Sequence, residues 1–418
     1  MALLTSPIRF RSRRASPWRA LLAGVLAVAI GAGPVLAANQ SVQGAKKEEV
    51  VGGYDTDVPS AILIDAESGS VLFEKNADEL RPPSSMMKLM TVELVFNLLT
   101  KGDIKLSDEY KISEYAWRRG GAPAGNSTMF AEIHSKVAVE DLLKGAIIQS
   151  GNDSCIALAE GIAGTEPAFV ERMTKRAREI GLTQSTFANS NGLPDPGNKM
   201  SVRELGRLAR HIILTYPDYY KLFGEKEFTW NKIRQTNRNP LLNLMQGADG
   251  LKTGYTKDGG YGLVGSAVQN GMRLIVVVNG VDDIDDRATE AKKLLEWGFR
   301  NFESRALFAS DATVGYARVF GGEKRYVPLI PAEPVRVMVR KNGSDKLIAR
   351  VVYTGPVAAP VEAGRRIGVV RVWRGPALAV EIPLQAAEAN PVGSTMRRAM
   401  DGASELVIGA FRAGMAKL

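Results

Sequence analysis

The segment Pro83-Ser84-Ser85-Met86-Met87-Lys88-Leu89-Met90-Thr91 joins a helix signal to two reactive side chains. Apolar residues recur at helical spacing from about Ser85 to Leu99, which predicts a helix with one buried face. Ser85 lies at the start of this predicted helix and Lys88 follows one turn later, so the amine can reach the hydroxyl. A lysine whose pKa is lowered by burial and nearby positive charge can take the serine proton, and the helix N-terminus offers N–H groups to a developing oxyanion.

The Ser-x-x-Lys spacing alone does not identify an enzyme, because it is common by chance. Ser85 could simply cap the helix. Ser84 is a second candidate nucleophile, although it lies four residues from Lys88 rather than three.

Residues Ser150-Gly151-Asn152 interrupt a second helical region, between the periodic stretches 139–149 and 156–162. A loop at this point can present a hydroxyl for proton transfer and an amide group that grips a peptide bond. An ordinary glycine-containing turn between two helices also explains the tripeptide on its own.

Residues Lys252-Thr253-Gly254 precede a glycine-rich pair of predicted strands. The glycine would let a substrate backbone approach the strand closely, and the lysine would supply positive charge for a carboxylate. A surface lysine on a strand is the simpler interpretation of the tripeptide alone. The order Ser-x-x-Lys, Ser-x-Asn, Lys-Thr-Gly is more specific, because this combination marks serine enzymes that react with penicillin.

The pattern around these motifs predicts an α/β sandwich, in which helices flank an antiparallel sheet. Residues 61–74 look like a β-hairpin, residues 200–214 a helix opened by a capping box, and residues 287–301 a long closing helix. Two strand-like runs, 262–268 and 272–279, are separated by the hairpin signal Gln269-Asn270-Gly271.

From about Leu307 the chain changes to short alternating segments separated by turns, which predicts a small all-β domain without a catalytic cluster. The predicted strands are 314–320, 335–340, 347–353, 367–373 and 377–382. The last segment, from Pro391, is predicted to form an amphipathic helix suited to the surface of a membrane, although its apolar face could also pack on the protein itself.

The N-terminus has the features of a secretory signal peptide. Five arginines in the first 19 residues precede an apolar run of about 14 residues that ends near Ala37, shorter than the ~20 residues that span a bilayer. Cleavage would remove residues 1–37, and an uncleaved anchor is the alternative. The predicted division is 1–37 signal peptide, 38–57 flexible lead, 58–306 catalytic domain, 307–390 all-β domain and 391–418 membrane-surface helix.

The composition excludes several other kinds of protein. With 45% hydrophobic and 24% charged residues the 418-residue chain is an ordinary globular protein, long enough for two or more domains. One cysteine and two histidines exclude a disulfide framework and make a zinc site implausible, so no metal or cofactor is expected. The net charge of +9 falls to about +4 without the leader, and no basic-aromatic stretch indicates a nucleic-acid partner.

Together the motifs resemble the low-molecular-mass penicillin-binding proteins, the D-alanyl-D-alanine carboxypeptidase family. The likeness is strong over about residues 58–303 and includes four blocks: 83–91, Ile147–Asp153, Asp249–Gly254 and Trp297–Arg300. The β domain and terminal helix resemble longer members in arrangement more than in residues.

The resemblance implies a peptidase that removes the terminal D-alanine from peptidoglycan stem peptides ending in D-Ala-D-Ala, and that β-lactam antibiotics acylate. Such an enzyme would be periplasmic, attached to the outer face of the inner membrane. Ser85 would be the nucleophile and Lys88 its base. Ser150 and Lys252 would transfer protons or orient charge, and Asn152 would bind the substrate amide. Thr253 and Arg287 would bind the terminal carboxylate, and Gly254 would allow the substrate to approach closely. The backbone N–H groups of Ser85 and Tyr255 would form the oxyanion hole.

Two departures from the family pattern are Tyr255, where some members carry His, and His134-Ser135 in a turn where Gly is common. Cys155 follows the second motif and is expected to be a buried structural thiol. The alternatives that stay open are a D,D-endopeptidase, a β-lactamase on the same fold, and an inactive cell-wall binding protein.

Overall fold

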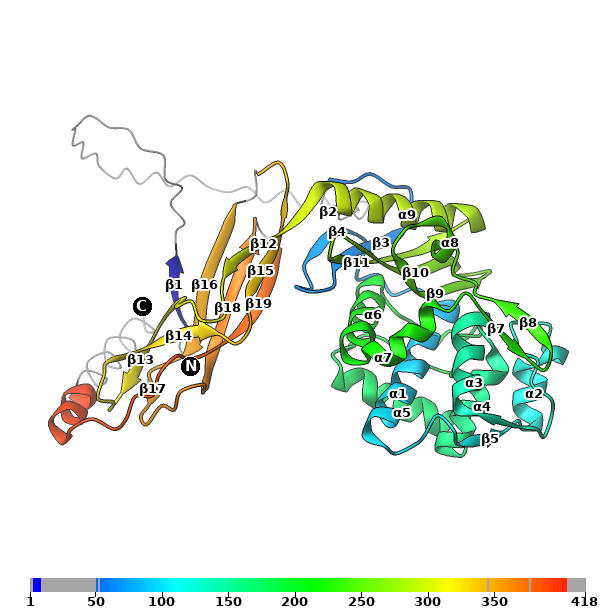
Figure 1. Ribbon diagram of the computed structural model, residues 1–418, viewed down its shortest axis with the longest axis horizontal. Coiled ribbons are helices and arrows are strands. Elements are labelled where there is room, and N and C mark those ends of the chain that lie inside the picture. Colours follow the sequence, from blue (N-terminus) through cyan, green and yellow to red (C-terminus); the bar gives the residue numbers. More distant parts are fainter. Residues whose placement is uncertain (1–2, 9–49, 52, 344–345, 376, 404–418) are drawn as a thin grey trace, which may run out of the picture.

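The computed structural model describes residues 3–8, 50–51, 53–343, 346–375 and 377–403. Figure 1 shows two parts, a mixed α/β part that contains the three motifs and an elongated β-rich part that follows it in sequence. The long helix α9 (Ile284–Asn301) ends the first part, and strand β12 (Phe302–Phe308) leads directly into the second.

A six-stranded antiparallel sheet forms the middle layer of the α/β part. Its strands, in spatial order, are β2 (Val50–Val51), β4 (Val71–Lys75), β3 (Ser60–Asp65), β11 (Met272–Val281), β10 (Gly260–Gln269) and β9 (Ala248–Thr256). The turn between β10 and β11 has positive φ at Asn270 and Gly271, as the hairpin signal predicts. Strand β9 is the last in the strand order and so forms one edge of the sheet.

Both faces of this sheet are buried, because side chains of a strand point alternately to opposite faces. Residues such as Leu63 and Val276 pack against α9, whereas Ile64 and Val277 pack against α6 (Val202–Thr215) and the other helices. Figure 1 shows α9 on one side of the sheet and the remaining long helices on the other.

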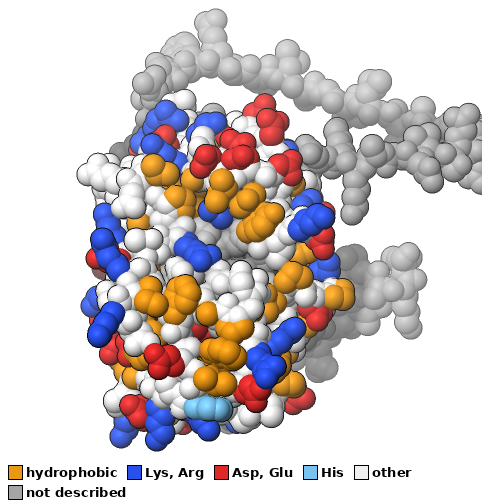
Figure 2. All heavy atoms as spheres, turned by 90° about the vertical axis from the view of Figure 1, so that its right-hand side faces the viewer, with side chains coloured by type: hydrophobic (Ala, Val, Ile, Leu, Met, Phe, Trp, Pro, Cys, Tyr) orange, Lys and Arg blue, Asp and Glu red, His pale blue; other side chains and the backbone are white. Residues whose placement is uncertain are grey.

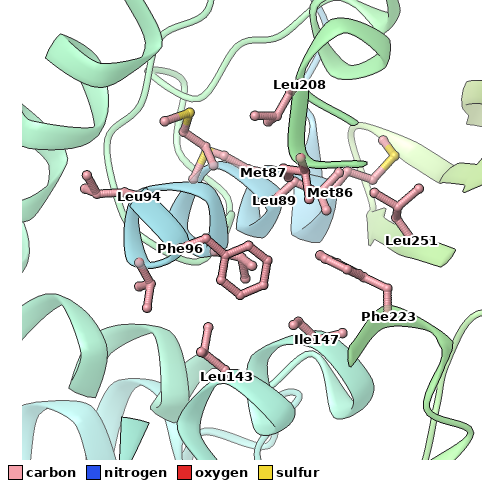
Figure 3. Packing of buried hydrophobic residues seen from close by; sticks show 14 of the residues in the cluster. Met86, Met87, Leu89, Leu94, Phe96, Leu143, Ile147, Leu208, Phe223 and Leu251 are labelled. Carbon is pink, nitrogen blue, oxygen red and sulfur yellow. The ribbon is translucent and has the colours of Figure 1, made fainter. Parts of the chain in front are cut away.

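The helical layer is built around the helix that carries the first motif. A 3₁₀ turn, η1 (Ser84–Met87), runs directly into α1 (Lys88–Lys101). Figure 3 shows Met86, Met87, Leu89 and Phe96 of this segment among apolar side chains from several other elements. The other helices are α2 (Glu114–Gly120), η2 (Ala122–Ala124), α3 (Val139–Lys144), the π-helical turn η3 (Gly145–Gln149), α4 (Asn152–Ala163), α5 (Glu166–Glu179), α7 (Pro217–Tyr220), η4 (Lys221–Gly224) and α8 (Leu241–Leu244).

Two small two-stranded sheets accompany the helical layer. They are β5 (Glu109–Lys111) with β6 (Lys136–Ala138), and β7 (Glu227–Trp230) with β8 (Ile233–Thr236). Figure 2 shows the side of the molecule that is on the right in Figure 1, with apolar side chains around its middle and charges of both signs along its rim.

The β-rich part has its own apolar core, formed largely by valines. Its sheet runs β1 (Leu3–Ile8), β16 (Leu347–Thr354), β18 (Arg366–Arg374), β19 (Ala377–Ala386), β14 (Tyr326–Pro331), β13 (Gly315–Phe320) and β17 (Val357–Ala358), and β12 pairs with β15 (Val335–Arg340). Strands β12, β14 and β17 are absent from the predicted set: β12 has four consecutive exposed residues instead of an alternating pattern, and β17 has only two residues. Ser70 Oγ donates to Ala379 O at 2.6 Å, a bond that joins the two parts.

Several predicted details differ from the structure. Helix α9 begins at Ile284, three residues earlier than predicted, because the Asp283 side chain caps it by accepting from Asp285 N. In the predicted capping box Ser201 accepts from Glu204 N, but the Glu204 carboxylate accepts from the backbone of residues 184 and 185 instead of closing the box. The terminal helix starts at residue 395 rather than near Pro391.

Both ends of the chain lie largely outside the described residues. Of the predicted leader only Leu3–Ile8 is described, and of the predicted terminal helix only residues 395–403. Met396 and Met400 are 73% and 66% exposed. Within the described ranges no helix combines the length and apolar character needed to cross a membrane.

Candidate active site

Ser85 and Lys88 lie one turn apart at the junction of η1 and α1, with Ser85 Oγ 3.0 Å from Lys88 Nζ. The first turn is a 3₁₀ helix rather than the regular α-helix expected from the periodicity. A 3₁₀ turn has three residues per turn, so side chains at i and i+3 eclipse each other, which suits this pair. Lys88 is fully buried, whereas Ser85 is partly exposed.

Three atoms surround the amine of Lys88. Besides Ser85 Oγ, it contacts Asn152 Oδ1 at 2.7 Å and the backbone oxygen of Asn191 at 2.5 Å. Both of these oxygens can only accept hydrogen bonds, so a neutral amine donates its two hydrogens to them. Its lone pair is then left for Ser85, which is the arrangement that a general base requires.

The surroundings of Lys88 favour the neutral amine. The pKa of Lys88 is lowered from 10.5 to about 8, chiefly by burial and also by the nearby Arg238 charge, while Cys155 and Asp153 act in the opposite direction. The first motif therefore provides a buried amine that can be deprotonated near neutral pH.

Ser150 lies between η3 and α4 in the left-handed region, at φ 65°. Its hydroxyl is buried and finds no hydrogen-bond partner among the described residues. Non-glycine residues in this region cost free energy and cluster at functional sites. The interruption predicted here is shorter than a loop, since Asn152 already opens α4.

Strand β9 brings the third motif to the same place. Lys252 is buried, and burial together with the positive charge of Lys88 holds the pKa of Lys252 well below its ordinary value. A side chain at Gly254 would lie 3.1 Å from atoms of Pro83, Ser84 and Met86. The glycine thus lets β9 pack against η1, and the close substrate approach suggested by the sequence stays a prediction.

Arg287 lies in the first turn of α9, not before the helix, and is mostly buried. Its guanidinium lies over the ring of Tyr261, 5.5 Å from the centroid, and Tyr261 stacks on Tyr255 at 4.1 Å between ring centroids. Burial lowers the pKa of Arg287, and its Nε has no partner within the described part of the chain. The Arg287 guanidinium is therefore well placed to bind an anion.

A cavity of about 700 Å³ connects these residues. Six predicted site residues line it, whereas Lys88, Asn152 and Lys252 lie beneath its surface: the six are Ser85, Ser150, Thr253, Gly254, Tyr255 and Arg287. A larger cavity of about 1020 Å³, between the β10–β11 turn and β12, contains none of the predicted residues. The positions of the predicted site residues therefore identify the smaller cavity as the candidate active site.

The sequence did not indicate several residues of this site. Arg238 donates to Ser127 Oγ at 2.6 Å and lines the cavity, as does Tyr261. Asn191 contributes a backbone oxygen, which no side-chain motif can reveal, although the Asn191-Gly192 pair is a turn signal. Among the described residues no cluster of histidine, cysteine and acidic side chains could hold a metal ion.

Comparisons with known proteins match most of the chain to two family models. The D-alanyl-D-alanine carboxypeptidase family matches residues 45–283, and the C-terminal domain of penicillin-binding protein 5 matches residues 302–391. The chain is 42% identical to the D-alanyl-D-alanine carboxypeptidase DacC of Escherichia coli over 77% of this chain and 82% of that protein. It is 33% identical to DacF of Bacillus subtilis over 79% and 85%.

Solved structures show the same likeness. Penicillin-binding protein 5 from Haemophilus influenzae superimposes with a TM-score of 0.73 at 36% identity, covering 82% of this chain and 99% of that one. Penicillin-binding protein D2 from Listeria monocytogenes in its ampicillin-bound form has a TM-score of 0.51 at 27% identity, covering 59% and 99%. This chain therefore belongs to the D-alanyl-D-alanine carboxypeptidase family and is a serine peptidase.

Proposed function

We propose that this protein removes the terminal D-alanine from peptidoglycan stem peptides ending in D-Ala-D-Ala, with Ser85 as nucleophile and Lys88 as general base. The observation that carries the proposal is the environment of the Lys88 amine. It is fully buried, its two hydrogens have acceptors, and its remaining neighbour is Ser85 Oγ.

In acylation, Ser85 Oγ attacks the carbonyl carbon between the two D-alanines while Lys88 takes the hydroxyl proton. The backbone N–H groups of Ser85 and Tyr255 stabilise the negative oxygen of the tetrahedral intermediate. The C–N bond then breaks, and the leaving amine receives a proton by way of Ser150, whose buried hydroxyl lines the same cavity. The products are an ester on Ser85 and free D-alanine.

In deacylation, water attacks this ester and Ser85 recovers its proton. Lys88 is the nearest base to Ser85 Oγ, so we assign it the activation of the water as well. Lys252 adds positive charge behind the site when it is protonated, although burial and the charge of Lys88 lower its pKa.

Two groups recognise the substrate in this proposal. Arg287 and Thr253, which both line the cavity, bind the terminal carboxylate. Asn152 accepts from Lys88 through Oδ1, and its amide nitrogen is a hydrogen-bond donor that we assign to the carbonyl of the substrate.

Penicillins should acylate Ser85 because their strained ring amide occupies the place of the D-Ala-D-Ala bond. Ampicillin-bound and cefotaxime-bound forms are known for penicillin-binding protein D2 from Listeria monocytogenes, which shares the fold and 26–27% identity. A β-lactamase would have to hydrolyse such an ester rapidly, and the family match favours the carboxypeptidase.

The place of action is part of the proposal. The Arg-rich start and apolar run support export through a signal peptide spanning residues 1–37. Exposed Met396 and Met400 support peripheral attachment of segment 391–418 to the outer face of the inner membrane. We also retain 38–57, 58–306 and 307–390 as the lead, catalytic and β domains, with β2 of the lead paired to the catalytic sheet and β12 crossing the second boundary.

Mass spectrometry after incubation with a diacetylated tripeptide ending in D-Ala-D-Ala tests the function. The expected result is free D-alanine and, with penicillin, one adduct on Ser85 that a Ser85→Ala variant lacks. Cleavage of crosslinked dimers without release of D-alanine would indicate an endopeptidase. Rapid turnover of penicillin without action on the peptide would indicate a β-lactamase, and no reaction with either would indicate a binding protein.

A further inference from the structure

The turn formed by Ser190, Asn191 and Gly192 lies against the start of α1. Two successive carbonyls of this turn accept hydrogen bonds from side chains one turn apart on α1: Ser190 O from Thr91 Oγ1 at 2.5 Å, and Asn191 O from Lys88 Nζ at 2.5 Å. The position of the turn therefore sets one of the two acceptors that orient the amine.

The same turn contacts the backbone of the nucleophile. Gly192 has φ +79°, and a side chain there would come within 2.0 Å of Ser84 O. Only glycine fits this contact. The turn cannot move toward Ser85 without a clash, so its position depends on what holds it from the opposite side.

Glu166, the first residue of α5, binds the turn on the side away from Ser85. Its Oε1 accepts from Ser190 N at 2.9 Å and Ser190 Oγ at 2.6 Å, and its Oε2 accepts from Tyr115 Oη at 2.9 Å. The carboxylate is mostly buried and lies at a helix N-terminus, where the macrodipole favours negative charge.

Packing alone does not fix the turn on this side. A cavity of about 220 Å³ lies there, lined by Tyr115, Glu166, Asn189 and Asn191 among others. The hydrogen bonds from Ser190 to Glu166 are the contacts that bridge from α5 to the turn beside this space.

We propose that Glu166 is a positioning residue for catalysis, which acts through Ser190 to hold the Asn191 carbonyl against the amine of Lys88. The inference rests on the proposed role of Lys88 as general base. Without Glu166 the turn can relax into the neighbouring cavity, and the amine loses the acceptor that directs its lone pair to Ser85. Misplacement of a reacting group by about 1 Å can lower a rate on the order of 100-fold.

The experiment measures the rate constant of Ser85 acylation by a fluorescent penicillin between pH 5 and pH 10. The variants are Glu166→Ala, Glu166→Gln and Ser190→Ala, and the exposed Glu171→Ala on the same helix is the matched control. Each rate is expressed per titratable active site, and thermal unfolding is followed in parallel.

For Glu166→Ala we expect acylation about 10- to 100-fold slower per site at the plateau. The acidic limb of the profile should also move to lower pH. In the wild type the Asn191 carbonyl stabilises the ammonium form of Lys88, so losing this acceptor lowers the pKa of Lys88. Glu166→Gln keeps an acceptor for Ser190 and should recover most of the rate. Ser190→Ala, which loses one of two bonds, should fall between, and Glu171→Ala should match the wild type.

A purely structural role for Glu166 predicts a different pattern. Fewer active sites would titrate, but each would react at the wild-type rate with an unmoved acidic limb, and this result would overturn the inference. If the wild-type protein itself neither reacts with penicillin nor releases D-alanine, the proposed function fails instead.

Discussion

Helix α1 carries two buried ionisable side chains, Lys88 and Glu93, in opposite environments. Burial alone would raise the pKa of Glu93, but hydrogen bonds from His211 and Arg176 outweigh it and hold the pKa below its ordinary value. Lys88 contacts only uncharged oxygens, and burial lowers its pKa to about 8. The comparison teaches that counter-charges keep the buried Glu93 ionised, so that it serves the fold. Lys88 has no counter-charge in contact with it, so it can lose its proton and act as a base.

The two clusters also differ in how completely they are satisfied. Glu93 accepts from Arg176 through both oxygens, at 2.9–3.3 Å, and from Tyr216 Oη at 3.0 Å. Near Lys88, the hydroxyl of Ser150 finds no partner among the described residues. The hydrogen bonds around Glu93 join α1 to α5 and α6, whereas the hydroxyl of Ser150 remains available to bind a substrate.

The largest expected effect concerns the reactive side of the comparison. Lys88→Met should slow acylation of Ser85 by about 10²- to 10⁴-fold, the usual contribution of a general base. The protein should remain folded, because a chain of similar length still fills the buried site. Stopped-flow measurement with a fluorescent penicillin checks the rate, and an acylation rate within a factor of three of the wild type would refute the role.

Glu93→Gln should produce the opposite phenotype. Arg176 would keep its charge in a largely buried position with only the half-exposed Glu179 as counter-ion, which costs up to about 3–5 kcal/mol in the free energy of unfolding. Acylation per active site should stay near the wild-type value. Urea unfolding measures the loss, and the partly exposed pair of Glu140 and Lys144 offers a control, since Glu140→Gln should cost less than about 1 kcal/mol.

The pH dependence follows from the sign of the Lys88 shift. Only the neutral amine can take the proton, so acylation should rise with pH, about tenfold per unit well below pH 8, and level off above the pKa of Lys88 near 8. An acylation rate that is constant from pH 5 to pH 9 would mean that another group is the base.

Arg238→Gln should have the smallest effect. Its charge helps to lower the pKa of Lys88, so removing it should move the acidic limb of the acylation profile to higher pH, by about half a unit. At neutral pH this corresponds to acylation roughly threefold slower. A limb that moves to lower pH would show that the Arg238 charge does not act on Lys88 in this way.

Much of the fold follows from local pattern. The central strands are apolar in nearly continuous runs because both faces of the sheet are buried, and the Asn270-Gly271 turn fixes their pairing. Details that depend on distant residues could not be predicted, such as the turning of Glu204 away from its capping box toward Ser185. Helix α9 begins three residues before its predicted start because the Asp283 side chain caps it, which the apolar periodicity does not indicate.

The site shows the same limit. Three short motifs predicted Ser85, Lys88 and Lys252, which the structure brings to one cavity and its floor. The carbonyl of Asn191 and the carboxylate of Glu166 reach Lys88 and Ser190 only through the tertiary fold, and neither belongs to a local pattern.

Titration of Lys88 by NMR, with lysine labelled at ¹³Cε and the signal identified by its absence in Lys88→Met, tests the central claim most directly. A midpoint near pH 8 is the predicted result, because the buried amine has only uncharged contacts. A midpoint at or above the ordinary lysine value of about 10.4 would mean that the amine stays protonated at neutral pH and cannot be the base for Ser85.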